Sequence, residues 1–210
     1  MTDRITRHFL IEKLPAVERG GFLCYLMGPY KSFNLNDVLS PEEQSRIDIE
    51  DLPGPLRRLF RSEDELSEAQ ALLRRIQGAL RLDPQVNAFL ALDIDVDIDD
   101  VDAVTQSIEF AHCSNAAAFI VPFLGHNFGV GEEAGSVLEA GSEMNAERLI
   151  FLHEKNVTSA MIHSARDRWD VRIAAYESET DLIDQLREFV AEVMHMERVG
   201  LLPEMKTGER

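Results

Sequence analysis

An unbroken apolar run at residues 22–27, with the sequence FLCYLM, constrains the fold more than any other feature of the chain. No polar residue interrupts it, and Gly28 and Pro29 end it abruptly. A strand with one face in water alternates apolar and polar residues, whereas a short unbroken run is typical of a strand covered on both faces. The run therefore predicts a central strand of a parallel sheet with helices on both sides.

Four more strand-like segments follow, and helix-like segments separate them along the chain. The predicted strands cover residues 88–92, 116–123, 149–152 and 171–176, the last with the alternation of an edge strand. One predicted helix carries the stripe Ala69, Leu72, Leu73, Ile76 and Leu80, and the last helix begins near Thr180 and buries Leu182, Leu186, Phe189, Val190 and Val193. This alternation predicts a three-layer α/β fold, a doubly wound five-stranded parallel sheet in the flavodoxin-like order 2-1-3-4-5.

The length of 210 residues predicts one α/β domain over residues 1–199. An irregular insertion is expected at about residues 31–66, because Pro41, Pro53 and Pro55 interrupt any regular element there. Residues 200–210 are expected to form a flexible tail.

The charge balance restricts the partners of the protein. Lysine and arginine total 21 against 38 acidic residues, which gives a net charge of −17. Nucleic acids and anionic membranes bind clustered cations, so neither is expected as a partner. Only four of the basic residues are lysine, and an acidic, lysine-poor composition indicates adaptation to concentrated salt, against the alternative of an ordinary acidic protein.

Salt adaptation makes a testable prediction about stability. In dilute buffer the carboxylates repel one another over a Debye length of ~30 Å, which shrinks to ~3 Å in molar salt. We expect the melting temperature to rise steeply between these conditions. Thermal unfolding across a KCl series measures this rise, and a flat melting temperature would contradict salt adaptation.

Other features argue for a cytoplasmic protein without a metal or a cofactor. The longest apolar run, residues 116–124, is far shorter than the ~20 residues that span a bilayer, and the N-terminus lacks an apolar signal segment. Cys24 and Cys113 are therefore expected to be free thiols. The alternating aspartates at residues 93–99 lack the glycine and glutamate of a calcium loop, so no metal site is predicted.

Two turns follow the strands between which the sheet order reverses. In an open parallel sheet, ligands bind beyond the carboxyl ends of the strands at this switch point. One turn carries Gly28, Pro29 and Tyr30. The other, at residues 125–131, is rich in glycine and carries His126, Asn127, Gly129 and Gly131. Both turns are predicted to line one crevice.

The glycine-rich turn leads into Glu132 and Glu133 at the start of a predicted helix. A pyrophosphate needs bare amides at a helix start, so two carboxylates there disfavour a dinucleotide cradle. A carboxylate can instead stabilise or trap the positive charge that develops on a sugar when a glycosidic bond breaks. The alternative is that both glutamates only interact with the helix dipole.

Two short motifs resemble those of the nucleoside 2-deoxyribosyltransferase-like superfamily. The segment YLMGPY at residues 25–30 resembles its Y-L-A-G-P-F opening, and GVGEEAG at residues 129–135 resembles its G-T-x-x-E-x-G motif. The resemblance implies that Glu133 is the catalytic nucleophile and that Tyr25 contacts it. It implies a nucleoside or nucleotide ligand bound by Gly28, Pro29, Tyr30, His126, Asn127, Gly129 and Gly131. TIR-type NAD-cleaving domains are a neighbouring resemblance, and the whole chain also resembles a family of small acidic haloarchaeal proteins.

Two interpretations of the crevice follow. In the first, the protein is a hydrolase or deoxyribosyl transferase that breaks an N-glycosidic bond with Glu133. In the second, it is a non-catalytic module that binds or senses a nucleotide. Asn127 and Asn115 stand where the resembling family has aspartates, which favours the second; Glu133 together with Tyr25 favours the first. A homodimer or higher homo-oligomer is compatible with both.

Overall fold

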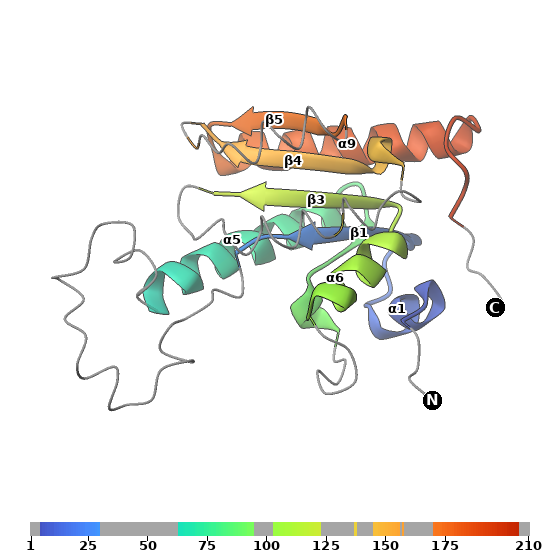
Figure 1. The fold of residues 1–210 in the computed structure, drawn as a ribbon, viewed down its shortest axis with the longest axis horizontal. Coiled ribbons are helices and arrows are strands. Elements are labelled where there is room, and N and C mark those ends of the chain that lie inside the picture. The colour runs from blue at the N-terminus through green and yellow to red at the C-terminus, as the bar shows by residue number, and fades with distance from the viewer. Residues whose placement is uncertain are drawn as a thin grey trace, which may run out of the picture.

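The computed structural model describes residues 5–29, 63–94, 103–122, 137, 145–155, 157 and 170–205. It contains a five-stranded parallel sheet in the order β2-β1-β3-β4-β5, which confirms the predicted fold class (Figure 1). The strands are β1 (Arg19–Met27), β2 (Val86–Phe89), β3 (Ala116–Val121), β4 (Leu149–Glu154) and β5 (Arg172–Tyr176).

Helices cover both faces of this sheet (Figure 1). The helices α5 (Glu63–Leu82) and α9 (Glu179–Arg198) pack on one face, and α1 (Arg7–Lys13) and α6 (Ala103–His112) pack on the other. Two short 3-10 turns, η2 (Ala91–Asp93) and η4 (Ala146–Arg148), complete the described elements. The sheet thus separates two apolar clusters, and the molecule has the three layers that the sequence predicts.

The strand β1 explains why the run at residues 22–27 has no polar position. Leu23, Tyr25 and Met27 enter the cluster under α1 and α6, whereas Cys24 and Leu26 enter the cluster under α5 and α9. All five side chains are completely buried. Burial also raises the pKa of the Cys24 thiol to about 12, so Cys24 is an unreactive core residue.

Two predicted boundaries require correction. The helix α5 begins at Glu63, inside the insertion predicted at 31–66, because the first turn of α5 precedes the apolar stripe from which the helix was predicted. The flexible tail predicted from residue 200 begins too early. Leu202 is buried, and the carbonyl of Pro203 accepts a hydrogen bond of 2.5 Å from Arg148. The chain is therefore packed at least as far as Pro203.

Candidate functional site

The carboxyl ends of β1 and β3 lie side by side at the switch point of the sheet. Met27 pairs in register with Phe119, two residues before the end of β3. The two turns singled out in the sequence therefore leave the same edge from neighbouring strands. The predicted site residues Tyr30, His126, Asn127, Gly129, Gly131 and Glu133 lie outside the described residues, and their roles stay predictions.

Tyr25 is the described residue with a predicted catalytic role. Its ring stacks on Phe89 at a centroid distance of 5.1 Å and meets the edge of Phe110 at 5.5 Å. Its hydroxyl lies 3.4 Å from the hydroxyl of Ser107 in α6. Aromatic contacts on two sides fix the orientation of the ring. The structure thus holds Tyr25 rigidly on the face of the sheet that α6 covers.

Val137 belongs to the same apolar cluster as Tyr25. It is helical and completely buried. Val137 therefore packs on the face of the sheet from which Tyr25 projects.

Gly28 was predicted to bind the substrate, and the structure gives it a packing role. A Cβ atom at this position would lie 2.8 and 2.9 Å from the methyl groups of Leu73 in α5. Leu73 is buried, so it has little space to move away. The close approach of α5 to the end of β1 therefore accounts for a glycine here without any ligand.

We expect Gly28→Ala to lower the free energy of unfolding by about 1–3 kcal/mol, the usual result of overpacking a core. Leu73→Ala opens space at the same point, so adding Gly28→Ala to that variant should cost almost nothing. Urea unfolding of the two single variants and the double variant measures the coupling. Equal losses in both backgrounds would contradict the contact.

A pocket of about 400 Å³ lies at the carboxyl ends of β3, β4 and β5, on the face of the sheet that α5 and α9 cover. Pro122, Glu154 and Tyr176, each at or directly after the end of one of these strands, line it together with α5 residues and the turn into α9. Sequence reasoning missed this pocket. Its only sequence signal is that polar residues follow two predicted strands, as at Glu154 and Glu177.

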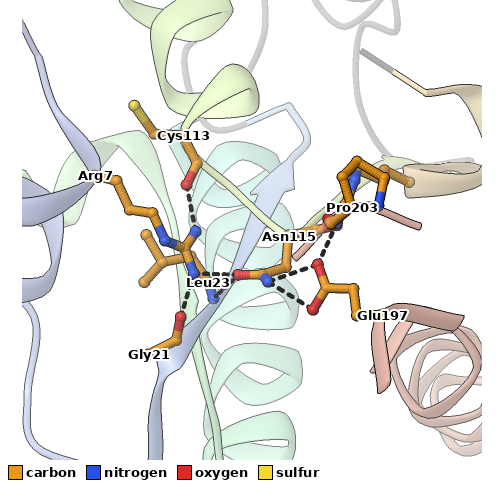
Figure 2. A network of polar contacts seen from close by, with 8 residues as sticks. Arg7, Gly21, Leu23, Cys113, Asn115, Glu197 and Pro203 are labelled. Atoms are coloured by element: carbon orange, nitrogen blue, oxygen red, sulfur yellow. Dashed lines mark hydrogen bonds and ion pairs between the residues drawn. The ribbon is translucent and has the colours of Figure 1, made fainter. Parts of the chain in front are cut away.

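At the opposite edge of the sheet, Asn115 is the centre of a polar network (Figure 2). Its side-chain oxygen accepts hydrogen bonds from the Leu23 amide at 2.9 Å and from Arg7 at 2.6 Å. Its side-chain nitrogen donates to both carboxylate oxygens of Glu197, at 2.9 and 3.0 Å. Asn115 directly precedes β3, so it lies at the amino edge of the sheet, opposite the carboxyl ends of the strands. The asparagine that stands here in place of the superfamily's aspartate therefore has a packing role.

Two arginines complete the network. Arg148 donates to Glu197 at 2.5 Å and to the Asn115 carbonyl at 2.8 Å. Arg7 donates to the carbonyl of Cys113 at 2.6 Å and to that of Gly21. Burial lowers the pKa of Arg7, and the Glu197 carboxylate partly offsets this effect. The network ties α1, β1, β3 and α9 together and has no sequence motif of its own.

Asp93, the first of the alternating aspartates, has a structural role. Its carboxylate accepts a hydrogen bond from the Leu90 amide at 2.9 Å and further ones from Arg74 and Gln77 of α5. Across the described part of the chain, no three histidine, cysteine, aspartate or glutamate residues are grouped so as to hold a metal ion. None of the described helices is long and apolar enough to cross a membrane.

The sheet order defines an α/β protein of flavodoxin-like topology, in which β1 and β3 are neighbours at the switch point. The chain belongs to the DUF7509 family, a domain of unknown function, whose model matches residues 7–206. The match runs from α1 to beyond Pro203, so the fold described above is that of the family domain. No match is found among the curated proteins.

Proposed function

We propose that the protein breaks the N-glycosidic bond of a nucleoside or nucleotide, as a hydrolase or a deoxyribosyl transferase, with Glu133 as the reacting carboxylate. The observation that carries this proposal is the adjacency of β1 and β3, through Met27 and Phe119, at the switch point of a 2-1-3-4-5 sheet. Ligands of such sheets bind there, and both motif-bearing turns start there.

The burial of Val137 supports the assignment of Glu133. The sequence predicts a helix over residues 132–139, and residues four apart lie on the same helical face. Glu133 is four residues before Val137, which packs in the cluster that contains Tyr25. This spacing favours Glu133 over Glu132 as the carboxylate directed toward Tyr25.

The chemistry requires one carboxylate and a group that orients it. As the bond between the sugar C1′ and the base nitrogen breaks, the base leaves with the electron pair and positive charge develops on the sugar. The Glu133 carboxylate bonds to C1′ or stabilises this charge until water or a second base adds. The Tyr25 hydroxyl orients the carboxylate.

Mass detection of free base, released from a panel of nucleosides, nucleotides and NAD, tests the proposal. Release from at least one compound is expected, and no release from any of them would contradict an enzymatic role.

A second candidate function is nucleotide binding without cleavage. It is favoured by Asn127, which stands where the nucleoside 2-deoxyribosyltransferase-like superfamily has an aspartate. It predicts that a nucleotide raises the melting temperature while no base is released, because a ligand of the folded state stabilises that state.

A further inference from the structure

We propose that the free edge of β5 binds an extended segment of a partner protein as a sixth strand, and that a lysine or arginine of this segment enters a pocket at the amino end of β5. This edge pocket has a volume of about 310 Å³ and is lined by Ala146 and Glu147 of η4 and by residues 170–173. It lies at the amino ends of β4 and β5, whereas the proposed nucleoside crevice lies at the carboxyl ends of β1 and β3.

The backbone of β5 offers unpaired groups to such a strand. The Tyr176 carbonyl accepts from the Lys155 amide at 2.8 Å, so the backbone groups of Tyr176 face β4. Those of Ile173 and Ala175 point the other way, because successive residues of a strand alternate in this respect. The Ala175 carbonyl already accepts from Gln185 of α9 at 3.0 Å. The N–H and C=O of Ile173 and the N–H of Ala175 have no hydrogen-bond partner among the described residues.

The two edges of the sheet differ in their protection. All residues of β2 are at most 1% exposed, and Gln77 and Arg81 of α5 both donate to the Ala88 carbonyl. In β5, at the other margin of the sheet, Arg172 and Ala175 are exposed (Figure 1). Its sequence RIAAY contains no proline or lysine, and it pairs with β4 in unbroken register. It therefore lacks the usual devices that keep other strands away from an edge.

The charge of the edge pocket indicates a cationic side chain. Glu147 and Asp170 are exposed, and neither carboxylate forms a hydrogen bond or an ion pair with a described residue. Glu147 acts on Arg172 only through its longer-range charge. Arg172 itself is occupied, because it donates to the Glu192 carboxylate at 2.6 Å. Two accessible carboxylates therefore remain to meet a cation of the partner.

Ile173 connects the strand edge to the edge pocket. Its side chain lines the pocket and, like Val171, packs on the cluster under α1 and α6, while its backbone groups point outward. A residue that pairs with Ile173 projects its side chain to the same face, with the two Cβ atoms about 5 Å apart. A lysine or arginine there can pack its apolar stem on Ile173 and direct its charge toward Glu147 and Asp170.

These features together match strand addition, in which backbone hydrogen bonds give affinity and a side-chain pocket gives specificity. A second copy of the chain is a poorer occupant, because it would bring a further net charge of −17 to an acidic edge. A basic segment has the complementary charge.

Fluorescence anisotropy tests the proposal with a short labelled threonine–valine peptide that carries one central lysine. At the lowest KCl concentration that keeps the protein folded, the lysine peptide should bind ~2–10-fold more tightly than the same peptide with glutamine, and a glutamate peptide should bind most weakly. A lysine peptide that is N-methylated along its backbone cannot donate to the Ile173 carbonyl. It should bind at least ~5-fold more weakly than the unmodified lysine peptide.

Variants of the protein test the same contacts from the other side. Glu147→Gln and Asp170→Asn should each weaken binding of the lysine peptide by ~2–5-fold and leave that of the glutamine peptide unchanged. Asparagine also tolerates the φ of 52° at position 170. Ile173→Pro removes the outward N–H, which an edge strand tolerates, and should weaken binding of every peptide.

Two matched variants serve as controls. Ile173→Val keeps the N–H, and Glu12→Gln removes an exposed carboxylate of α1. Both should bind the lysine peptide as the unchanged protein does.

Absence of lysine-peptide binding, equal binding of the lysine and glutamate peptides, or unchanged binding by both Glu147→Gln and Asp170→Asn would each overturn the proposal. So would a dimer in solution that Ile173→Pro dissociates, because a second copy would then occupy the edge. The comparison among peptides uses the unchanged protein, so it holds even where a variant does not fold. Peptide binding is measured without a nucleoside, so its failure is distinct from a failure to release base.

Discussion

Glu133→Gln is expected to lower turnover on the cleaved nucleoside at least ~100-fold, which corresponds to ~2.7 kcal/mol of barrier. Glutamine keeps the shape of the side chain but removes the negative charge that opposes the positive charge of the sugar in the transition state. Substrate binding should change little, because the substrate itself carries no such charge. Base release measures kcat, and calorimetry on the same variant measures binding.

Glu132→Gln is the matched control for this prediction. Successive residues of a helix project about 100° apart, so only one of the two glutamates can lie over the strand ends. Glu132→Gln should lower the free energy of unfolding by only ~0.3–1 kcal/mol, the usual contribution of a charge at a helix start, and should leave turnover unchanged. Equal losses of turnover in the two variants would contradict the assignment of Glu133, and a change in nucleotide affinity without any turnover would favour the binding module.

The parts of the fold that the sequence predicts well are those with strong periodicity. The unbroken run at residues 22–27 is the central strand β1, and the alternation at residues 171–176 is the edge strand β5. All five residues predicted to be buried on the last helix are buried in α9. These predictions succeed because burial on one or both faces determines residue type directly along an element.

The parts that sequence reasoning missed depend on contacts between distant segments. Asn115 bonds to Arg7 and Glu197, which lie 108 and 82 residues away along the chain, and no local pattern reports such a pairing. Gly28 precedes a proline in a turn, which favours a ligand-binding interpretation, yet its neighbour is Leu73 of a distant helix. The edge pocket likewise becomes evident only when η4 and the start of β5 are packed together.

Glu197→Ala is expected to lower the free energy of unfolding by ~3–5 kcal/mol, the usual cost of removing one partner from a buried ion pair. The Glu197 carboxylate is the partner of Arg148, whose side chain is only 4% exposed, and it accepts from the Asn115 amide. Without it, Arg148 stays buried with a charge that nothing neutralises, and Arg7, bonded to Asn115, loses the nearby negative charge. Urea unfolding in molar KCl measures the loss.

Glu192→Ala on the same helix is the matched control, because it removes a carboxylate from an exposed ion pair and not from a buried one. Glu192 pairs with Arg172 at 2.6 Å, but the two side chains are 43% and 39% exposed, so its removal should cost at most ~1 kcal/mol. Salt screens an exposed pair far more than a buried one. The cost of Glu192→Ala should therefore shrink as KCl rises, while that of Glu197→Ala persists. If the two variants lost the same stability at every salt concentration, Glu197 would be an ordinary surface carboxylate, and the network at the amino edge would not hold α9 to the sheet.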